Sequence, residues 1–192
     1  MNDSTILNTP EIHSKILKKS EEIGFSMPSD LFVGSLLRTL ITSKQGGQFL
    51  ELGTGIGLSL AWMIEGMDEK AHIITIDNDE ELASIASAYF GQHPGVEIIC
   101  EDATNWIQNN KDKSFDLIFA DAWPGKYSLL EEVLGMVKKG GFYIIDDMSH
   151  QPNWPKGHEG NVDLLIAYLE KRKDFTITKL NWSTGLIIAS RK

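Results

Sequence analysis

FLELGTGIGLS, residues 49–59, is typical of a short apolar strand that runs into a glycine-rich turn and then into the start of a helix. Because Gly53, Gly55 and Gly57 have no side chains, the backbone N–H groups of this turn can come close to a ligand. The first strand-to-helix turn of a nucleotide-binding parallel sheet carries a sequence of this kind. The stretch therefore predicts an α/β protein with a ligand site at this turn.

The spacing of the turn is Gly-x-Gly-x-Gly, which differs from the Gly-x-Gly-x-x-Gly of dinucleotide-binding turns. Glu51 stands two residues before the first glycine, and a carboxylate there suits an ammonium group better than a pyrophosphate. We therefore expect a ligand with an ammonium group, while the alternative is a structural turn without a ligand.

Short apolar strands alternate with helical segments after this turn, which is the pattern of a parallel sheet with helical crossovers. The predicted strands are 48–52, 72–77, 96–100, 115–120 and 141–146, and the predicted helices lie near 58–66, 80–90, 103–109, 129–138 and 162–171. Two further strands, 175–180 and 185–190, are separated by a connection too short for a crossover. They predict a terminal antiparallel hairpin.

Two amphipathic helices are predicted before the first strand, in 10–23 and 31–41. Gly24 ends the first helix, and Ser29 or Asp30 caps the second. We expect a single domain, 1–192, with a helical cover (1–45) and a Rossmann-like core (46–192). The leading helix either covers the sheet or pairs two copies of the chain as a homodimer.

The composition is that of an ordinary globular protein, with 42% hydrophobic and 23% charged residues among 192. A formal net charge of −9 disfavours nucleic acid and membrane surfaces as partners. The single cysteine, Cys100, follows an apolar run and is expected to be buried. Since the chain shows neither a signal-peptide pattern nor an apolar stretch of about 20 residues, we expect a cytoplasmic protein that acts on a small molecule.

Acidic residues stand at the ends of the predicted strands, at the sheet edge where ligands bind. Asp77, 24 positions after Gly53, suits the ribose hydroxyls of an adenosine ligand, although such a residue can also cap a helix. Asp102 either accepts a hydrogen bond from an adenine amino group or caps the next helix. Asp121 ends the fourth strand and is followed closely by Trp123.

The glycine run, Asp77, residues 101–103, Asp121 and residues 140–147 together resemble class I S-adenosylmethionine-dependent methyltransferases. The resemblance implies a Rossmann-like three-layer sandwich with a seven-stranded, mostly parallel sheet of order 3-2-1-4-5-7-6. It also implies that Glu51 holds the methionyl amino group, Asp77 the ribose and Asp102 the adenine. The candidate cofactor-binding residues are Glu51, Gly53, Thr54, Gly55, Gly57, Ser59, Asp77, Asn78, Asp102, Ala103, Asp121 and Trp123.

Within that class, Asp121 with Trp123, and Asp146 with Asp147 at the next strand end, look like the small catechol or caffeoyl-CoA type of O-methyltransferase. In that group three oxygen ligands hold a divalent metal, which implies Asp121, Asp146 and Asp147 here, where the third ligand is usually Asn. Oxygen ligands favour Mg²⁺, Mn²⁺ or Ca²⁺. In the metal-free alternative, the three aspartates cap helices and bind solvent.

A base must take the proton of an acceptor hydroxyl. The resemblance places a catalytic lysine three residues after the first aspartate, but Pro124 stands there in this chain, and Lys126 is the nearest basic residue. Asp121 and Lys126 are therefore the candidate catalytic residues. His150 or His158, in the long loop after the fifth strand, is an alternative base or a ring on the surface.

These features favour S-adenosylmethionine-dependent O-methylation of a small hydroxylated molecule. Trp123 and Trp154 are expected to wall the acceptor pocket. One alternative is an NAD-dependent oxidoreductase, which shares the sheet and the acidic residue after the second strand. Another is a non-catalytic S-adenosylmethionine sensor, which Pro124 in the lysine position would fit.

Overall fold

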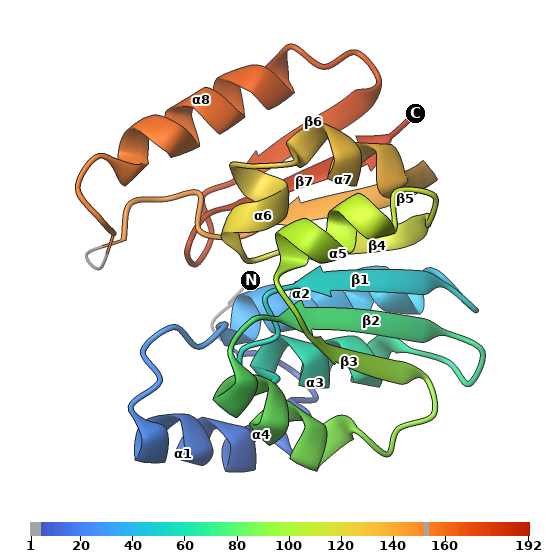
Figure 1. Ribbon diagram of the computed structural model, residues 1–192, viewed down its shortest axis with the longest axis vertical. Coiled ribbons are helices and arrows are strands. Elements are labelled where there is room, and N and C mark those ends of the chain that lie inside the picture. Colours follow the sequence, from blue (N-terminus) through green and yellow to red (C-terminus); the bar gives the residue numbers. More distant parts are fainter. Residues whose placement is uncertain (1–4, 152–153) are drawn as a thin grey trace.

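The computed structural model describes residues 5–151 and 154–192, and its seven-stranded sheet has the order β3-β2-β1-β4-β5-β7-β6 (Figure 1). Strands β1 to β5 are parallel, and β7 runs antiparallel to both β5 and β6. The strands are β1 (Gln48–Leu52), β2 (His72–Asp77), β3 (Val96–Cys100), β4 (Phe115–Ala120), β5 (Val137–Ile145), β6 (Phe175–Leu180) and β7 (Leu186–Arg191). The predicted strand order and terminal hairpin are confirmed.

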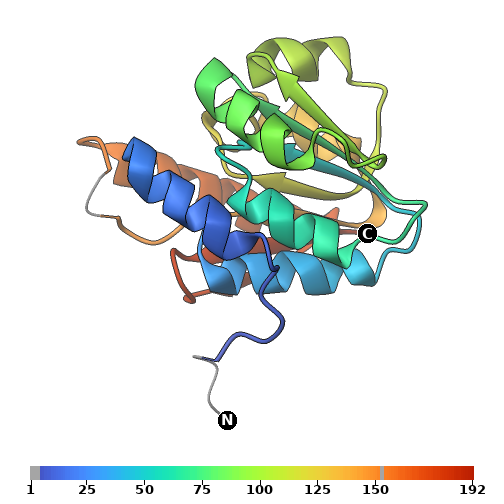
Figure 2. The ribbon, with the colours of Figure 1, turned by 90° about the horizontal axis from the view of Figure 1, so that it is seen from below.

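Helices cover both faces of this sheet, which gives three layers (Figure 2). One apolar core lies between the sheet and α1, α2, α3 and α4, and the other lies between the sheet and α5, α7 and α8. The helices are α1 (His13–Ile23), α2 (Leu31–Thr42), α3 (Leu58–Gly66), α4 (Glu80–Phe90), α5 (Ala103–Asn109), α6 (Trp123–Lys126), α7 (Leu130–Met136) and α8 (His158–Glu170). No helix in the described ranges is long and apolar enough to cross a membrane.

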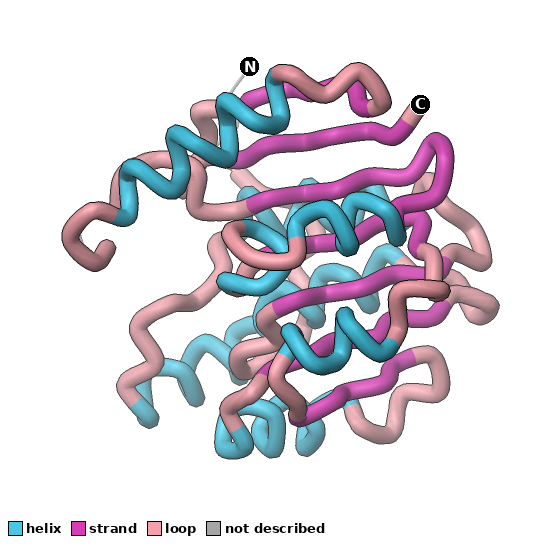
Figure 3. Tube along the Cα trace, turned by 45° about the horizontal axis from the view of Figure 1, so that its top comes forward, coloured by secondary structure: helices cyan, strands magenta, loops and turns pink. Residues whose placement is uncertain are grey.

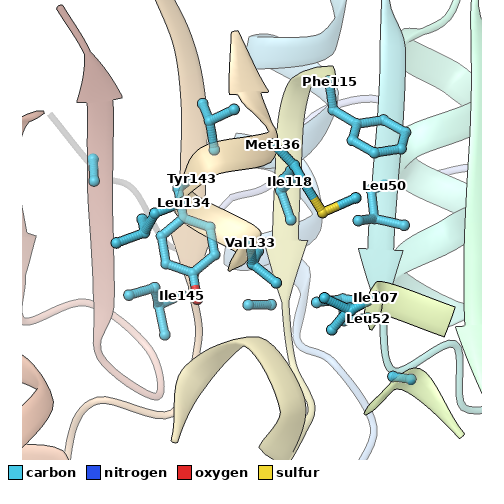
Figure 4. Packing of buried hydrophobic residues seen from close by; sticks show 14 of the residues in the cluster. Leu50, Leu52, Ile107, Phe115, Ile118, Val133, Leu134, Met136, Tyr143 and Ile145 are labelled. Atoms are coloured by element: carbon cyan, nitrogen blue, oxygen red, sulfur yellow. The ribbon is translucent and has the colours of Figure 1, made fainter. Parts of the chain in front are cut away.

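The second core is formed by residues of β1, β4 and β5 that pack against α7 (Figure 4). Leu50, Ile118 and Tyr143 come from the strands, and Val133 and Leu134 come from α7; all five are buried. Tyr143 is the polar exception among these side chains, because its ring carries a hydroxyl group into the apolar cluster. This core fixes the positions at which β4 and β5 end.

Side chains at the helix ends explain where the first helices start and stop. Asp30 is the N-cap of α2, and its Oδ1 accepts a hydrogen bond of 2.9 Å from the N–H of Val33. Gly24 ends α1 in the left-handed conformation, with φ of 70°. Of the two predicted caps of the second helix, Asp30 is therefore the one that is used.

The structure corrects three predictions about the elements. Strand β5 begins at Val137 rather than at 141, because its pairing with β4 continues through a register shift around the turn at Gly140. Helix α8 begins at His158, earlier than predicted. Cys100 is exposed rather than buried, because β3 is the edge strand and its last residue faces solvent.

The strands lie side by side in one sheet (Figure 3), and the carboxyl ends of the five parallel strands lie at one edge of it. The chain builds the sheet in one direction from β1 through β2 to β3, and then in the opposite direction from β4 onward. The strand order therefore reverses between β1 and β4, which are neighbours in the sheet. Open α/β sheets bind ligands in the crevice at such a point. The predicted site residues are therefore to be sought at this edge.

Candidate active site

A cavity of about 890 Å³ opens at this edge, between the loops that follow the parallel strands, the segment 25–30 and the start of α8. Nine of the predicted cofactor-binding residues line it: Gly53, Thr54, Gly55, Asp77, Asn78, Asp102, Ala103, Asp121 and Trp123. The other three, Glu51, Gly57 and Ser59, do not line it.

The glycine turn has backbone angles that favour glycine, with φ of 99° at Gly53 and 91° at Gly57. A Cβ on Gly53 would lie 2.6 Å from the main-chain oxygen of Asp121, so the turn packs directly on the end of β4. A Cβ on Gly57 would lie 2.9 Å from the ring of Phe90. The lack of a side chain at Gly57 therefore allows α3 to pack closely on α4, and its predicted contact with a ligand stays a prediction.

Glu51, at the end of β1 before the turn, is fully buried. The hydroxyl of Ser59 donates to Oε1 and that of Thr75 to Oε2, both at 2.5 Å. Burial raises the pKa of Glu51 to about 8, although the two hydrogen bonds act to lower it. Glu51, Ser59 and Thr75 thus form a buried hydrogen-bonded unit next to the turn, and the predicted ligand contacts of Glu51 and Ser59 stay predictions.

Asp77 joins the glycine turn to the end of β2. Its Oδ2 accepts a hydrogen bond of 2.7 Å from the N–H of Gly55, and its Oδ1 accepts one of 2.9 Å from the N–H of Asp79. Asp79, rather than Asp77, is the N-cap of α4. Asp102 caps α5 through a 2.6 Å hydrogen bond from the N–H of Thr104, and it lines the cavity as well.

Asp121, Asp146 and Asp147 meet at the other end of the cavity, at the ends of β4 and β5. Burial raises the pKa of Asp121 to about 6, against the opposing effect of the nearby Lys126. Burial also raises the pKa of Asp146 to about 7, and the neighbouring Asp121 adds to that shift. Oδ1 of Asp146 accepts hydrogen bonds from the Thr184 hydroxyl and from the N–H of Asp147, the latter at 2.7 Å.

The side chain of Lys126 lies next to that of Asp121, although Lys126 is five positions further along the chain. Its side chain is 5% exposed, and its Nζ is 3.4 Å from Oδ1 of Asp121. Between them, Pro124 (φ −65°, ψ 135°) and Gly125 (φ 93°, ψ −29°) have the backbone angles of a type II turn. The structure therefore brings the two candidate catalytic residues together.

The predicted metal site is not assembled in the described part of the chain, which contains no group of three or more His, Cys, Asp or Glu side chains that could hold a metal ion. Carboxylate oxygens are suitable ligands for Mg²⁺. However, Asp121 already faces the ammonium group of Lys126, and Asp146 is bonded to the Thr184 hydroxyl. As they stand, Asp121, Asp146 and Asp147 do not fit a divalent metal.

Four rings line the cavity next to these aspartates. The ring centroid of Trp123 is 4.8 Å from that of Tyr127, and the centroid of Trp154 is 4.7 Å from that of His158. The Tyr127 hydroxyl lies 3.3 Å from Nε2 of His158. His150 does not line the cavity and pairs with a glutamate of α8 at 2.7 Å. Of the two candidate histidines, only His158 faces the site.

Two further parts of the cavity wall are the segment 25–30, where Met27 is a predicted cofactor contact, and Thr184, which was not among the predicted site residues. The segment 25–30 crosses the glycine turn, so that a Cβ on Gly55 would lie 3.2 Å from the ring of Phe25. Thr184, in the turn between β6 and β7, is distant in sequence and carries no spacing signal that points to Asp146. Pro152 and Asn153, in the predicted loop after the fifth strand, lie outside the described residues.

The fold and the site together define a class of protein. Class I S-adenosylmethionine-dependent methyltransferases have this sheet order, with β7 antiparallel to its neighbours. They also have the glycine turn after β1 and the carboxylate at the end of β2. Membership of this class excludes the alternative that the chain is an NAD-dependent oxidoreductase.

The chain belongs to the O-methyltransferase family, whose model matches residues 11–158. A relative from Mycobacterium sp. (strain KMS), named "Putative O-methyltransferase", is 32% identical over 118 residues, which cover 59% of this chain and 54% of the relative. The chain thus spans about half the length of the curated relatives it matches.

Solved structures share the fold. An O-methyltransferase from Bacillus cereus in complex with SAH has a TM-score of 0.85 at 20% identity, covering 98% of this chain and 94% of that chain. The O-methyltransferase TomG from Streptomyces achromogenes, involved in tomaymycin synthesis and solved with SAM, has a TM-score of 0.83 at 22% identity, covering 98% and 93%.

Proposed function

We propose that this chain transfers a methyl group from S-adenosylmethionine to a hydroxyl group of a small molecule. The observation that carries the proposal is that one cavity is lined both by the glycine turn with Asp77 and by the pair Asp121 and Lys126. A methyl-binding end and a proton-accepting end thus share one enclosed space. When bound, S-adenosylmethionine supplies a methyl group on a positively charged sulfur.

The donor end consists of the residues that line the cavity around the glycine turn. We assign the ribose hydroxyls to Asp77, whose carboxylate is already held in place by two backbone N–H groups. We assign the adenine amino group to Asp102. The remaining proposed cofactor contacts are Gly53, Thr54, Gly55, Asn78, Ala103, Asp121 and Trp123.

The acceptor end favours a small hydroxylated molecule with a flat apolar part. Trp123, Tyr127, Trp154 and His158 offer ring surfaces there. Lys126 is the one lysine or arginine among the described residues that line the cavity, and the chain has a formal net charge of −9. A polyanionic acceptor would therefore meet little positive charge.

Asp121 and Lys126 manage the proton of the acceptor hydroxyl in this proposal. Burial raises the pKa of Asp121, which makes its carboxylate a stronger base, and this carboxylate can accept that proton. The ammonium group of Lys126, 3.4 Å away, stabilises the negative charge that develops on the acceptor oxygen. The surrounding rings limit the access of water.

No step of this proposal uses a divalent metal, because the three aspartates do not fit one as they stand. Methyl transfer is therefore expected to continue at an unchanged rate after exhaustive treatment with EDTA. A loss of activity that Mg²⁺ restores would show that the carboxylates rearrange around a metal, and would overturn this part of the proposal.

Calorimetry with S-adenosylmethionine and with its demethylated product tests the donor end. Asp77→Asn is expected to weaken binding about tenfold or more, since it removes a charged hydrogen-bond acceptor of nearly equal size. Asp112→Asn, on an exposed turn, is the matched control and should leave the affinity unchanged. The absence of heat with both ligands would refute the proposal.

Transfer of labelled methyl groups to a panel of phenols, catechols, hydroxy acids and amines tests the acceptor end. We expect labelled product from a hydroxylated aromatic compound. Binding of S-adenosylmethionine without transfer to any compound of the panel would instead favour the non-catalytic sensor.

A further inference from the structure

Tyr143 carries a buried hydroxyl group that the proposed reaction does not use. It lies near the carboxyl end of β5, is 0% exposed, and has the side chains of Val133, Leu134 and Ile145 around its ring (Figure 4). Its hydroxyl donates a hydrogen bond to the carbonyl oxygen of Gly125. The contact joins the apolar core to the turn that precedes Lys126.

This turn has little freedom around Gly125. The residue has φ of 93°, and a Cβ there would lie 2.6 Å from Cδ1 of Leu52. The N–H of Gly125 donates a 2.7 Å hydrogen bond to the carbonyl oxygen of Ser128, and the N–H of Tyr127 donates a 3.0 Å bond to the carbonyl oxygen of Trp123. With the Tyr143 hydroxyl, both polar main-chain groups of Gly125 are bonded.

The Gly125 carbonyl belongs to the same planar peptide unit as the nitrogen of Lys126. A hydrogen bond that fixes the orientation of this carbonyl therefore also fixes the N–Cα bond of Lys126, from whose Cα the side chain starts. From that start the buried side chain places its Nζ 3.4 Å from Asp121. A phenylalanine at position 143 would fill nearly the same volume but would remove the hydrogen bond that the Gly125 carbonyl oxygen accepts.

We propose that Tyr143 is a positioning residue for the reaction, acting through the Gly125 carbonyl to hold Lys126 at Asp121. The inference rests on the proposed function, in which this pair manages the proton of the acceptor. It extends the site into the core, because Tyr143 does not line the cavity.

The test compares Tyr143→Phe with Tyr89→Phe, which removes the hydroxyl of a partly buried tyrosine on α4 that does not line the cavity. We expect Tyr143→Phe to lower kcat about tenfold to a hundredfold while KM for both substrates changes less than about twofold. Tyr89→Phe should keep the kcat of the natural sequence. In the variant that combines Tyr143→Phe with Lys126→Met, kcat should be no lower than with Lys126→Met alone, since both changes act on one group.

An unchanged kcat in Tyr143→Phe, or losses that multiply in the double variant, would overturn the inference. If Tyr143→Phe fails to fold, Tyr143→4-aminophenylalanine keeps a donor at the same place and is expected to keep kcat within about threefold of the natural sequence. A crystallographic comparison does not depend on turnover: Nζ of Lys126 should lie beside Asp121 in the natural sequence and away from it in Tyr143→Phe. This comparison still decides the inference if no methyl transfer is found and the proposed function fails.

Discussion

The buried carboxyl group of Glu51 should make the stability of this protein depend on pH. Replacement by glutamine keeps the shape of the side chain and removes its titration. The amide can still accept a hydrogen bond from Ser59, and its NH₂ group can donate to Thr75, whose hydroxyl is also 2.6 Å from that of Thr54. Glu51→Gln is therefore expected to fold with the same hydrogen-bond partners, while the bond to Thr75 reverses its direction.

The sign and size of the effect follow from the pKa values. Burial raises the pKa of Glu51 from 4.5 to about 8. Between pH 4.5 and pH 8, the Glu51 carboxyl group is therefore protonated in the folded protein and ionised in the unfolded chain. The stability associated with this group is fully present below pH 4.5 and is lost as the pH rises toward 8. At about 1.4 kcal/mol per pH unit, the loss between pH 5 and pH 7 amounts to about 2–3 kcal/mol as an upper limit.

Urea unfolding of the ligand-free protein at pH 5, 6, 7 and 8, followed by tryptophan fluorescence, measures this change. The free energy of unfolding of Glu51→Gln should increase relative to that of the natural sequence as the pH rises, because the other titrating carboxyl groups are common to both proteins. Glu97→Gln, an exposed glutamate on β3, is the matched control and should follow the natural sequence. Equal pH dependence of the natural sequence and Glu51→Gln would refute the reasoning.

Three further changes test the site. Lys126→Met should lower kcat about a hundredfold or more without changing the affinity for S-adenosylmethionine in calorimetry, whereas the exposed Lys113→Met should leave both unchanged. Gly53→Ala should lower the free energy of unfolding by about 1–3 kcal/mol in urea titrations, because φ is 99° and the Cβ would meet the Asp121 carbonyl oxygen; Gly135→Ala, with open space around it, should not be destabilising. Trp123→Ala should raise KM for the acceptor several-fold in steady-state kinetics with little change in Tm, since the side chain is 52% exposed.

The sheet and the donor end of the cavity could be predicted because their signals are local in the sequence. The alternation of apolar strands with helical segments fixes the sheet type, and the positions of the glycine turn and Asp77 at successive strand ends bring them to one edge. The hydrogen bond between Asp77 and Gly55 is a direct result of that placement. Cys100 shows where local signals fail, because apolar neighbours do not reveal that a strand lies at the edge.

The burial of Glu51 could have been predicted with a further step. Strand β1 lies in the middle of a parallel sheet that has helices on both faces, so every residue of its second half is buried whichever way it points. A carboxyl group in such a strand has to find hydroxyl or N–H partners within the core. Ser59 and Thr75 supply hydroxyl groups as these partners, and the hydrogen-bonded group lies next to the glycine turn.

Lys126 could not be assigned by counting positions from Asp121. The lysine stands two residues beyond the position that the resemblance implies, but the intervening Pro124 and Gly125 form a type II turn that brings its side chain back to the carboxylate. Proline followed by glycine is the usual sequence of the two central positions of that turn, so the signal was present as turn chemistry rather than as spacing. Whether a catalytic group has been lost or only displaced along the chain is thus decided by the backbone between the two residues, and here that backbone is held by a hydroxyl from the core.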